Sequence, residues 1–369
     1  MVGGSDLTRS DTVRDSMLVD QAVFTSLPSA TGQGYRLTAV TSGVTAEERR
    51  ELTRRSPSHD SLIDEGTGTR GLLALPLAST RVAVGVVRFA GREHTGRGGQ
   101  RVHTHFAIVT NDQYARFAGN PIKIAAAIME AIGTDPLLEE DVRLDLLLLE
   151  AEPPLCLFPI SDPSRERELD RSDTVIEVAD TLFAGRAVLL VASTHARETL
   201  EWSLLLLPLG LRMTAGVSLG LRFALGRELA CTVLPEHDTS TARAVRGHAI
   251  TQLDALAPGS GGLSDFGVWL DFVGRRWREG RTTEIHRLTG RMGFPVGAAQ
   301  LDRVVAILDD AEFCLTCDAA ELAALIDRYV TESFNPELEG DLAEQLLETA
   351  HSRMASLESG SLMCGVLGS

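Results

Sequence analysis

Lysine is almost missing from the chain. Only one of its 35 lysine and arginine residues is a lysine, Lys123. The phosphate-binding P-loop of an NTPase requires a lysine after a glycine-rich turn, followed by serine or threonine. Lys123 stands in the sequence GNPIKI, which has neither the glycine spacing nor the hydroxyl residue. The chain is therefore not itself a P-loop NTPase.

Positive charge is also scarce. Arginine and lysine together number 35 against 51 acidic residues, which gives a net charge of −16 and an isoelectric point near 5.0. Binding to nucleic acid or to an anionic lipid surface needs clustered positive charge. We therefore expect neither nucleic acid nor a membrane surface as a main partner.

Cysteines are few, and no long hydrophobic run is uninterrupted. The five cysteines are odd in number and irregularly spaced, which excludes the paired framework of a secreted disulfide-rich protein. The longest apolar stretch, residues 200–221, contains Glu201, Pro208 and Arg212, whereas a membrane-spanning helix needs about 20 apolar residues. Residues 1–20 are polar and lack the apolar core of a signal peptide. We expect a cytoplasmic protein.

The first 135 residues carry mostly strand patterns. Thr45 and Glu48 have the spacing of a capping box, which predicts a helix that begins after Thr45. Two more helices are expected near residues 111–117 and 121–132. Apolar segments between turn residues predict strands at 21–27, 35–40, 72–78, 81–90 and 101–110.

Helical patterns dominate the later part of the chain. Residues 187–192 are an all-apolar run typical of a buried strand, and residues 198–207 predict a helix that ends at Pro208. After a glycine-rich break at 257–262, apolar residues recur every three or four positions in four segments, 266–278, 298–310, 319–334 and 338–356. The predicted fold class is α+β, with a β-rich N-terminal domain, a mixed α/β middle domain and a mainly helical C-terminal domain.

The length predicts two or three domains, because one domain usually holds about 100–200 residues. Composition and the breaks between patterns place their limits. We expect a disordered arm at 1–18, the N-terminal domain at 19–135, the middle domain at 136–257, the helical C-terminal domain at 258–357 and a flexible tail at 358–369.

Two histidines, His103 and His105, share one predicted strand. Because side chains alternate along a strand, both imidazoles point to the same face. Such a pair could bind a metal or act as acid and base, which supports an alternative hypothesis, a metal- or histidine-dependent hydrolase. A metal site needs three or four ligands, and the spacing indicates no third one, although Glu93 and His94 are near in sequence. We favour the simpler interpretation, a half-exposed face of the sheet without chemistry.

A lone CxxC motif, Cys314 and Cys317, falls in the helical part. A structural zinc site needs a second such pair, and a redox motif needs a thioredoxin-like βαβ setting; the sequence indicates neither. We expect both thiols to serve as small buried apolar side chains.

Several segments of the first block resemble one known family. They are DQAVFTSL at 20–27, GQGYRL at 32–37, SGVTAEE at 42–48, GGQRVHTHFAIV at 98–109 and GNP at 119–121. In combination they resemble the N-terminal domain of the GTPase-associated adaptor proteins of bacterial conflict systems. Residues 187–235 look similar to the middle domain of that family. The resemblance covers roughly residues 18–250 and leaves the helical C-terminal part without a match.

The resemblance implies an adaptor or scaffold and implies no catalytic residue, cofactor or metal. The protein would bind a GTPase encoded nearby, or its effectors, and couple them in defence or signalling. Such an adaptor should show an apolar surface patch, whereas the hydrolase alternative should line a concave pocket with His103 and His105. The positions that match family motifs, as candidate structural or interface residues, are Gln21, Gly32, Gly34, Tyr35, His105, Asn120 and Pro121.

Overall fold

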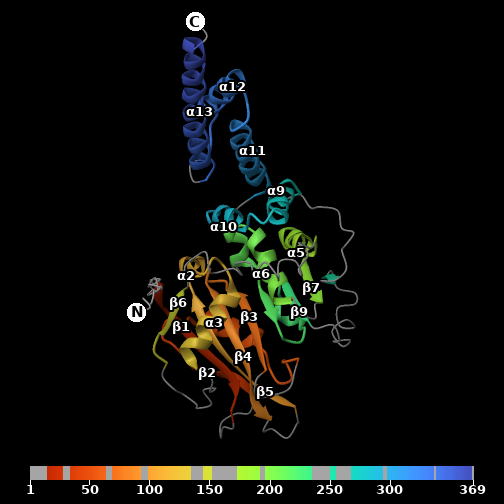
Figure 1. The fold of residues 1–369 in the computed structure, drawn as a ribbon. Helices are drawn as coiled ribbons and strands as arrows, with labels where there is room; N and C mark the ends of the chain where they lie inside the picture. Colours follow the sequence, from red (N-terminus) through yellow and green to blue (C-terminus); the bar gives the residue numbers. More distant parts are fainter. Residues whose placement is uncertain are drawn as a thin grey trace, which may run out of the picture.

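The structure is a computed structural model, and its ribbon shows three tiers (Figure 1). A large sheet forms the base, a group of helices covers one end of it, and a helical arm leads away to the C-terminus. The arm consists of α11 (Ala298–Cys314), α12 (Ala319–Thr331) and α13 (Glu339–Leu367). The residues that the structure describes are 15–27, 34–63, 69–92, 99–133, 144–151, 173–191, 196–234, 250–254, 267–293, 297–335 and 338–367.

The described strands form one sheet in the order β10-β7-β9-β8-β3-β4-β5-β1-β2, and β6 pairs with β1. The half from β3 to β2 is antiparallel, and β8, β9, β7 and β10 run parallel. The bounds are β1 (Asp15–Ser26), β2 (Tyr35–Val40), β3 (Arg70–Pro76), β4 (Val82–Arg92), β5 (Gln100–Val109), β6 (Leu147–Ala151), β7 (Ala187–Val191), β8 (Val217–Leu219), β9 (Cys231–Leu234) and β10 (Ile250–Asp254).

Strand pairing joins the β-rich block (residues 19–135) to the mixed block (136–257) through β3 and β8, and also through β1 and β6. β8 pairs with β3 in antiparallel register, with Ala74 opposite Val217, and with β9 in parallel register. The predicted N-terminal and middle domains therefore share a continuous sheet. Together with the helical C-terminal part, this confirms the α+β class; the domain limits at residues 135 and 257 stay predictions.

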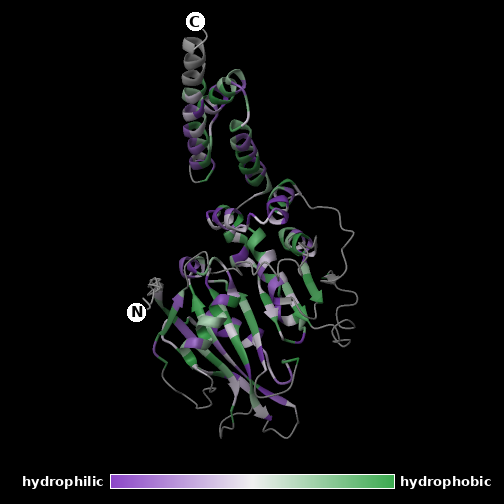
Figure 2. Cartoon of the chain, in the orientation of Figure 1, coloured by the Kyte–Doolittle hydropathy of each residue, from purple (hydrophilic) through white to green (hydrophobic). Residues whose placement is uncertain are grey.

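The central strands are buried on both faces, which explains their nearly continuous apolar sequence. Along β4, Val84 packs in the large core on one face and Val87 in a smaller core on the other. Gly85 lies opposite Phe106 of β5. A Cβ atom at Gly85 would stand 2.6 Å from the Phe106 ring, so this position requires glycine. Figure 2 shows the same apolar character along these strands.

Capping explains where several helices begin. Thr45, Thr110 and Asp318 each form a complete capping box, in which the side chain and the third helical residue satisfy free amides. The helices outside the arm are α1 (Ala46–Arg55), α2 (Asn111–Arg116), α3 (Pro121–Ile132), α5 (Asp173–Phe183), α6 (Ala196–Leu206), α7 (Leu209–Thr214), α9 (Gly267–Arg278) and α10 (Thr282–Gly290), with a short 3-10 turn η2 (Leu225–Arg227).

The structure differs from the sequence predictions at both ends. β1 begins at Asp15, inside the predicted disordered arm, because Met17 and Val19 are buried against β6. α13 continues to Leu367 through the predicted flexible tail; glycine lowers helix stability by about 1 kcal/mol but does not by itself end a helix. The sequence patterns also did not predict α5, α7, α10, β6, β8 or β10.

Tryptophans attach the helical part to the mixed block. The Trp202 ring of α6 packs on the Trp277 ring of α9, with centroids 4.5 Å apart. Trp269 Nε1 of α9 donates to the Leu206 carbonyl at 3.0 Å. The first two helices of the C-terminal part, α9 and α10, are therefore packed onto α6 (Figure 1). Within the described residues, none of the helices has the length and apolar character needed to span a membrane.

Candidate functional site: a buried motif network and an exposed leucine edge

Two of the family-motif residues form a buried hydrogen bond. Gln21 of β1 and His105 of β5 are 7% and 6% exposed, and Gln21 Oε1 lies 2.6 Å from His105 Nε2. Gln21 Nε2 donates to the Asp145 carbonyl at 2.6 Å. Because the amide nitrogen is used there, the Gln21 oxygen must accept, and His105 carries its proton on Nε2. The pair ties the sheet to the segment that enters β6.

The His103–His105 face is buried, not half-exposed as the sequence predicted. The two imidazoles do lie on one face, with ring centroids 6.2 Å apart, but His103 is only 1% exposed. The same face of β5 carries Ala107 and Val109, which belong to the large core with α3 and β6. A sequence pattern shows which face a residue occupies but not which later element covers that face.

The surroundings of the two histidines oppose a bound cation. Arg88 of β4 stands directly opposite His103 in the strand register. Burial, together with the nearby His103 and Arg88, lowers the pKa of His105 to about 3. Among the residues that the structure describes, no three His, Cys, Asp or Glu side chains gather to hold a metal; Glu93 and His94 lie outside them. No observation on the described residues favours the hydrolase alternative.

Two further motif residues shape the hairpin between β1 and β2. Gly34 has φ +121°, a left-handed conformation that favours glycine. The Tyr35 hydroxyl accepts the Val102 amide at 3.0 Å, and its ring stacks on Phe24 with centroids 5.8 Å apart. Gly32 lies outside the described residues. Gly34 and Tyr35 therefore have structural roles where β2 begins.

Asn120 and Pro121 begin α3 and reach the mixed block. The Asn120 Oδ1 accepts the amides of Ile122 and Lys123 at 3.0 and 3.4 Å, and Pro121 suits the first helical turn because it needs no donor there. Asn120 Nδ2 donates to Glu201 Oε1 of α6 at 3.3 Å. Burial raises the pKa of Glu201, which is 3% exposed. The Asn-Pro motif thus connects the first block to the second.

A buried arginine outside the motifs ties three parts of the chain together. Arg212 of α7 is 1% exposed, and burial lowers its pKa to about 9. It donates to the carbonyls of Ala118, Leu205 and Leu207 at 2.6, 3.0 and 2.9 Å, and to the hydroxyl of Thr289 on α10. No local pattern signals this role, because in the sequence Arg212 appears only as an interruption of a long apolar stretch.

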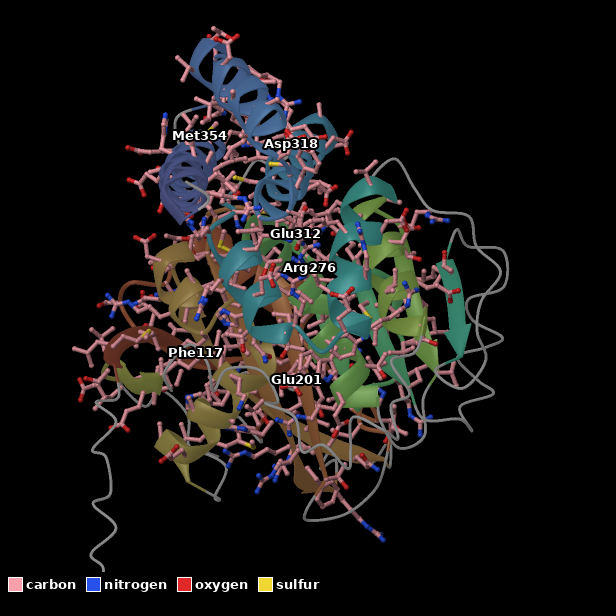
Figure 3. The ribbon with its side chains drawn as sticks, turned by 45° about the horizontal axis from the view of Figure 1, so that its top comes forward. Phe117, Glu201, Arg276, Glu312, Asp318 and Met354 are labelled. Carbon is pink, nitrogen blue, oxygen red and sulfur yellow. The ribbon has the colours of Figure 1, made fainter. Side chains whose placement is uncertain are left out.

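The root of the helical arm holds a second buried arginine (Figure 3). Arg276 of α9 is 2% exposed and lies 3.4 Å over the centre of the Phe272 ring. It donates to Glu284 of α10 at 3.0 Å and to Glu312 of α11 at 2.6 Å. The half-exposed carboxylates keep one side of this cluster in water. The arrangement connects three helices at the point where the arm leaves the body.

An ion cluster explains the glycine in the motif SGVTAEE. Arg81 donates to Asp20 at 2.7 Å and to both oxygens of Glu48. Although burial raises the pKa of Glu48, hydrogen bonds from Arg81, Ser79 and the Thr45 amide outweigh it and lower that pKa to about 2. A Cβ atom on Gly43 would stand 2.4 Å from the Asp20 carboxylate. The cluster stabilises the helix entry.

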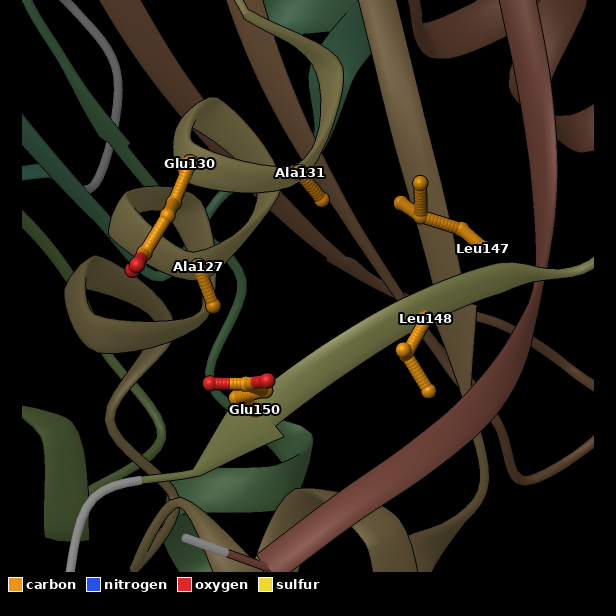
Figure 4. Close-up of a pocket in the computed structure, with 6 residues that line it drawn as sticks. All are labelled: Ala127, Glu130, Ala131, Leu147, Leu148 and Glu150. Carbon is orange, nitrogen blue, oxygen red and sulfur yellow. The ribbon is translucent and has the colours of Figure 1, made fainter.

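Three exposed leucines, here called the leucine edge, lie on or next to the β1–β6 strand pair: Leu18, Leu146 and Leu148. They are 56%, 50% and 50% exposed. Leu18 of β1 and Leu148 of β6 are direct cross-strand partners. Between α3 and β6 lies a groove of about 330 Å³ (Figure 4), lined by Ala127, Glu130, Ala131, Leu147, Leu148 and Glu150.

Comparison with known proteins bears on the first block. Residues 18–140 match the model of the family described as GTPase-associated protein 1, N-terminal domain type 2. This confirms the family resemblance predicted from the motifs of that block. The match ends before residues 187–235, so the resemblance of that stretch to a middle domain stays a prediction. A search of curated proteins finds no match.

Proposed function

We propose that the chain is a non-catalytic adaptor that binds a GTPase encoded nearby and couples it to other components of a bacterial conflict or signalling system in the cytoplasm. The observation that carries this proposal is the match of residues 18–140 to a GTPase-associated domain. Because the chain lacks a P-loop, GTP hydrolysis would have to come from the partner.

The architecture supports a scaffold. Arg212 bonds to groups from the first block, the mixed block and α10, and Asn120 bonds to Glu201 across the first two. Buried and satisfied polar contacts of this kind hold elements in one arrangement. A body held in this way can present the leucine edge at one place and the helical arm at another. We keep the predicted domains, 19–135, 136–257 and 258–357, as part of this proposal.

The experiment is co-expression of the chain with the neighbouring GTPase, followed by gel filtration with GDP or with a non-hydrolysable GTP analogue. We expect one co-eluting complex whose yield depends on the nucleotide. The isolated chain should show no GTP hydrolysis. Separate elution with both nucleotides would reject the adaptor function, and GTP hydrolysis by the isolated chain would reject its non-catalytic character.

A further inference from the structure

We propose that Glu312 is an ionic latch that holds the helical arm against the body, and that the arm swings away when salt or a competing anion weakens the contacts of Glu312 with Arg276 and Arg281. The arm is then a movable element of the protein. This inference goes beyond the proposed function, because it does not depend on which partner the chain binds.

The arm is a packing unit of its own with one main contact to the body. Within the arm, α13 packs along α11 and α12. Tyr329 stacks on Phe334 with ring centroids 5.3 Å apart, and its hydroxyl donates to Asp310 at 2.7 Å. The arm meets the body mainly where α11 packs on α9 (Figure 1). The arm can therefore change its angle to the body while the contacts among its own helices stay intact.

Opposite charges face each other across this junction. Residues 298–367 contain 14 acidic residues and three arginines, a net charge of −11, while the whole chain carries −16. Residues 267–291, which include α9 and α10, contain six arginines and three acidic residues. The arm is therefore attracted to this part of the body. Because salt screens the attraction between exposed charges, we expect the position of the arm to depend on ionic strength.

Glu312 is the residue at which this attraction converges. Its Oε1 accepts hydrogen bonds from Arg276 at 2.6 Å and from Arg281 at 3.1 Å (Figure 3). The Glu312 side chain is 46% exposed, so water and dissolved ions reach it. Arg291 also donates to Asp341 of α13 at 2.8 Å, but both of these side chains are exposed, where an ion pair contributes little.

Release of Glu312 leaves both arginines with partners. Arg276 is 2% exposed, and a buried cation that lost its last carboxylate would strongly destabilise the fold. Without Glu312, it keeps Glu284 at 3.0 Å and the Phe272 ring at 3.4 Å. Arg281 keeps Glu284 at 2.6 Å, and the released carboxylate enters water. The open state therefore contains no unpaired buried charge at this place, which allows the latch to open reversibly.

The test measures the distance between body and arm in single molecules of the full chain. Fluorescent dyes are attached to azide-bearing residues that replace Arg50 of α1 and Val330 of α12, two exposed positions. The chains compared are wild type, Glu312→Gln and the control Glu344→Gln. Glu344 is an exposed carboxylate of α13, so the control makes the same chemical change outside the latch. Each is measured at about 50 mM and about 500 mM NaCl, where the Debye length is about 14 Å and about 4 Å.

Wild type at low salt should give one narrow distribution of distances, and high salt should broaden it. Glu312→Gln should raise the released fraction about five- to tenfold already at low salt, because it removes the charge from two partly exposed ion pairs. Added salt should then change that fraction little. Glu344→Gln should behave as wild type does. Circular dichroism should be the same for all three chains, since the helices remain folded when the arm moves.

Three results would overturn the inference. If Glu312→Gln shows the wild-type distribution at low salt, Glu312 does not hold the arm. If salt broadens the distributions of wild type and Glu312→Gln equally, salt acts on other contacts. If Glu312→Gln loses helical signal, the residue stabilises the helices themselves and is not a latch. None of these results bears on whether the chain binds a GTPase.

Discussion

Replacing Arg212 with methionine should strongly destabilise the protein. The substitution keeps most of the side-chain volume but removes four hydrogen bonds from a residue that is 1% exposed. A buried acceptor that loses its donor costs about 1–3 kcal/mol. Methionine carries no charge, so the desolvation cost of the buried guanidinium disappears, and this offsets part of the lost hydrogen-bond energy. We therefore expect the free energy of unfolding to fall by about 3–5 kcal/mol.

Urea denaturation, monitored by tryptophan fluorescence, measures this loss of stability, and the tryptophans report on the region around Arg212. The chain has three tryptophans, and all of them lie on α6 or α9, beside the elements that Arg212 joins. The urea midpoint should fall with little change in the m-value. Arg54→Met is the matched control, because Arg54 is exposed and its ion pair among the described residues, with Glu228, lies at the surface, where such pairs contribute about 0–1 kcal/mol. If Arg212→Met and Arg54→Met unfold at the same urea concentration, Arg212 does not hold the first block, the mixed block and α10 together.

Three further predictions concern Gly43, Glu48 and His105 of the first block. Gly43→Ala should destabilise the protein by about 1–3 kcal/mol in urea denaturation, because the new methyl would overlap the Asp20 carboxylate; a stability equal to wild type would reject the contact. The folded pKa of Glu48, about 2, is below its ordinary value of 4.5. Its stabilisation is therefore complete above pH 4.5 and is lost as the pH falls toward 2, so that Glu48→Gln should flatten the pH dependence of stability in that window. The folded pKa of His105, about 3, is also below its ordinary value of 6.5. The unfolded chain then takes up the proton first, so this group destabilises the fold as the pH falls below 6.5, and its NMR signal should not titrate between pH 8 and 5; a midpoint near 6.5 would contradict its burial beside Gln21.

Much of the first block was predictable from the sequence, because its signals are local. The capping box at Thr45 and Glu48 forms as the spacing predicts. The strand around His103 and His105 is present, with both rings on one face. Alternation along a strand and satisfaction of helix-end amides act within a few residues, so a single sequence contains them.

The contacts between blocks were not predictable. Asn120 and Glu201 are 81 positions apart, and Ala118 and Arg212 are 94 apart. No periodic pattern links such positions, and without homologues their pairing leaves no trace in one sequence. The same limit explains the misjudged exposure of His103, because burial depends on elements that pack across the strand. The leucine edge also escaped detection, since Leu146 and Leu148 stand in an apolar segment that gives no sign of which leucines face solvent.

The two CxxC thiols were predicted correctly for a local reason. Cys314 ends α11 and Cys317 follows in the turn before α12, and both are buried in the arm. Burial raises the pKa of the Cys314 thiol, which makes it a poor nucleophile. Their setting is helical, as the amphipathic spacing around them indicated.

The central claim is that this chain binds a GTPase, and isothermal titration of the purified chain with the purified neighbouring GTPase tests it most directly. The account predicts saturable binding with a stoichiometric endpoint, with a Kd that differs between the GDP-loaded and GTP-analogue-loaded forms. The absence of heat and of complex formation with both forms, at protein concentrations up to ~100 μM, where even a weak specific interface would be detected, would contradict it.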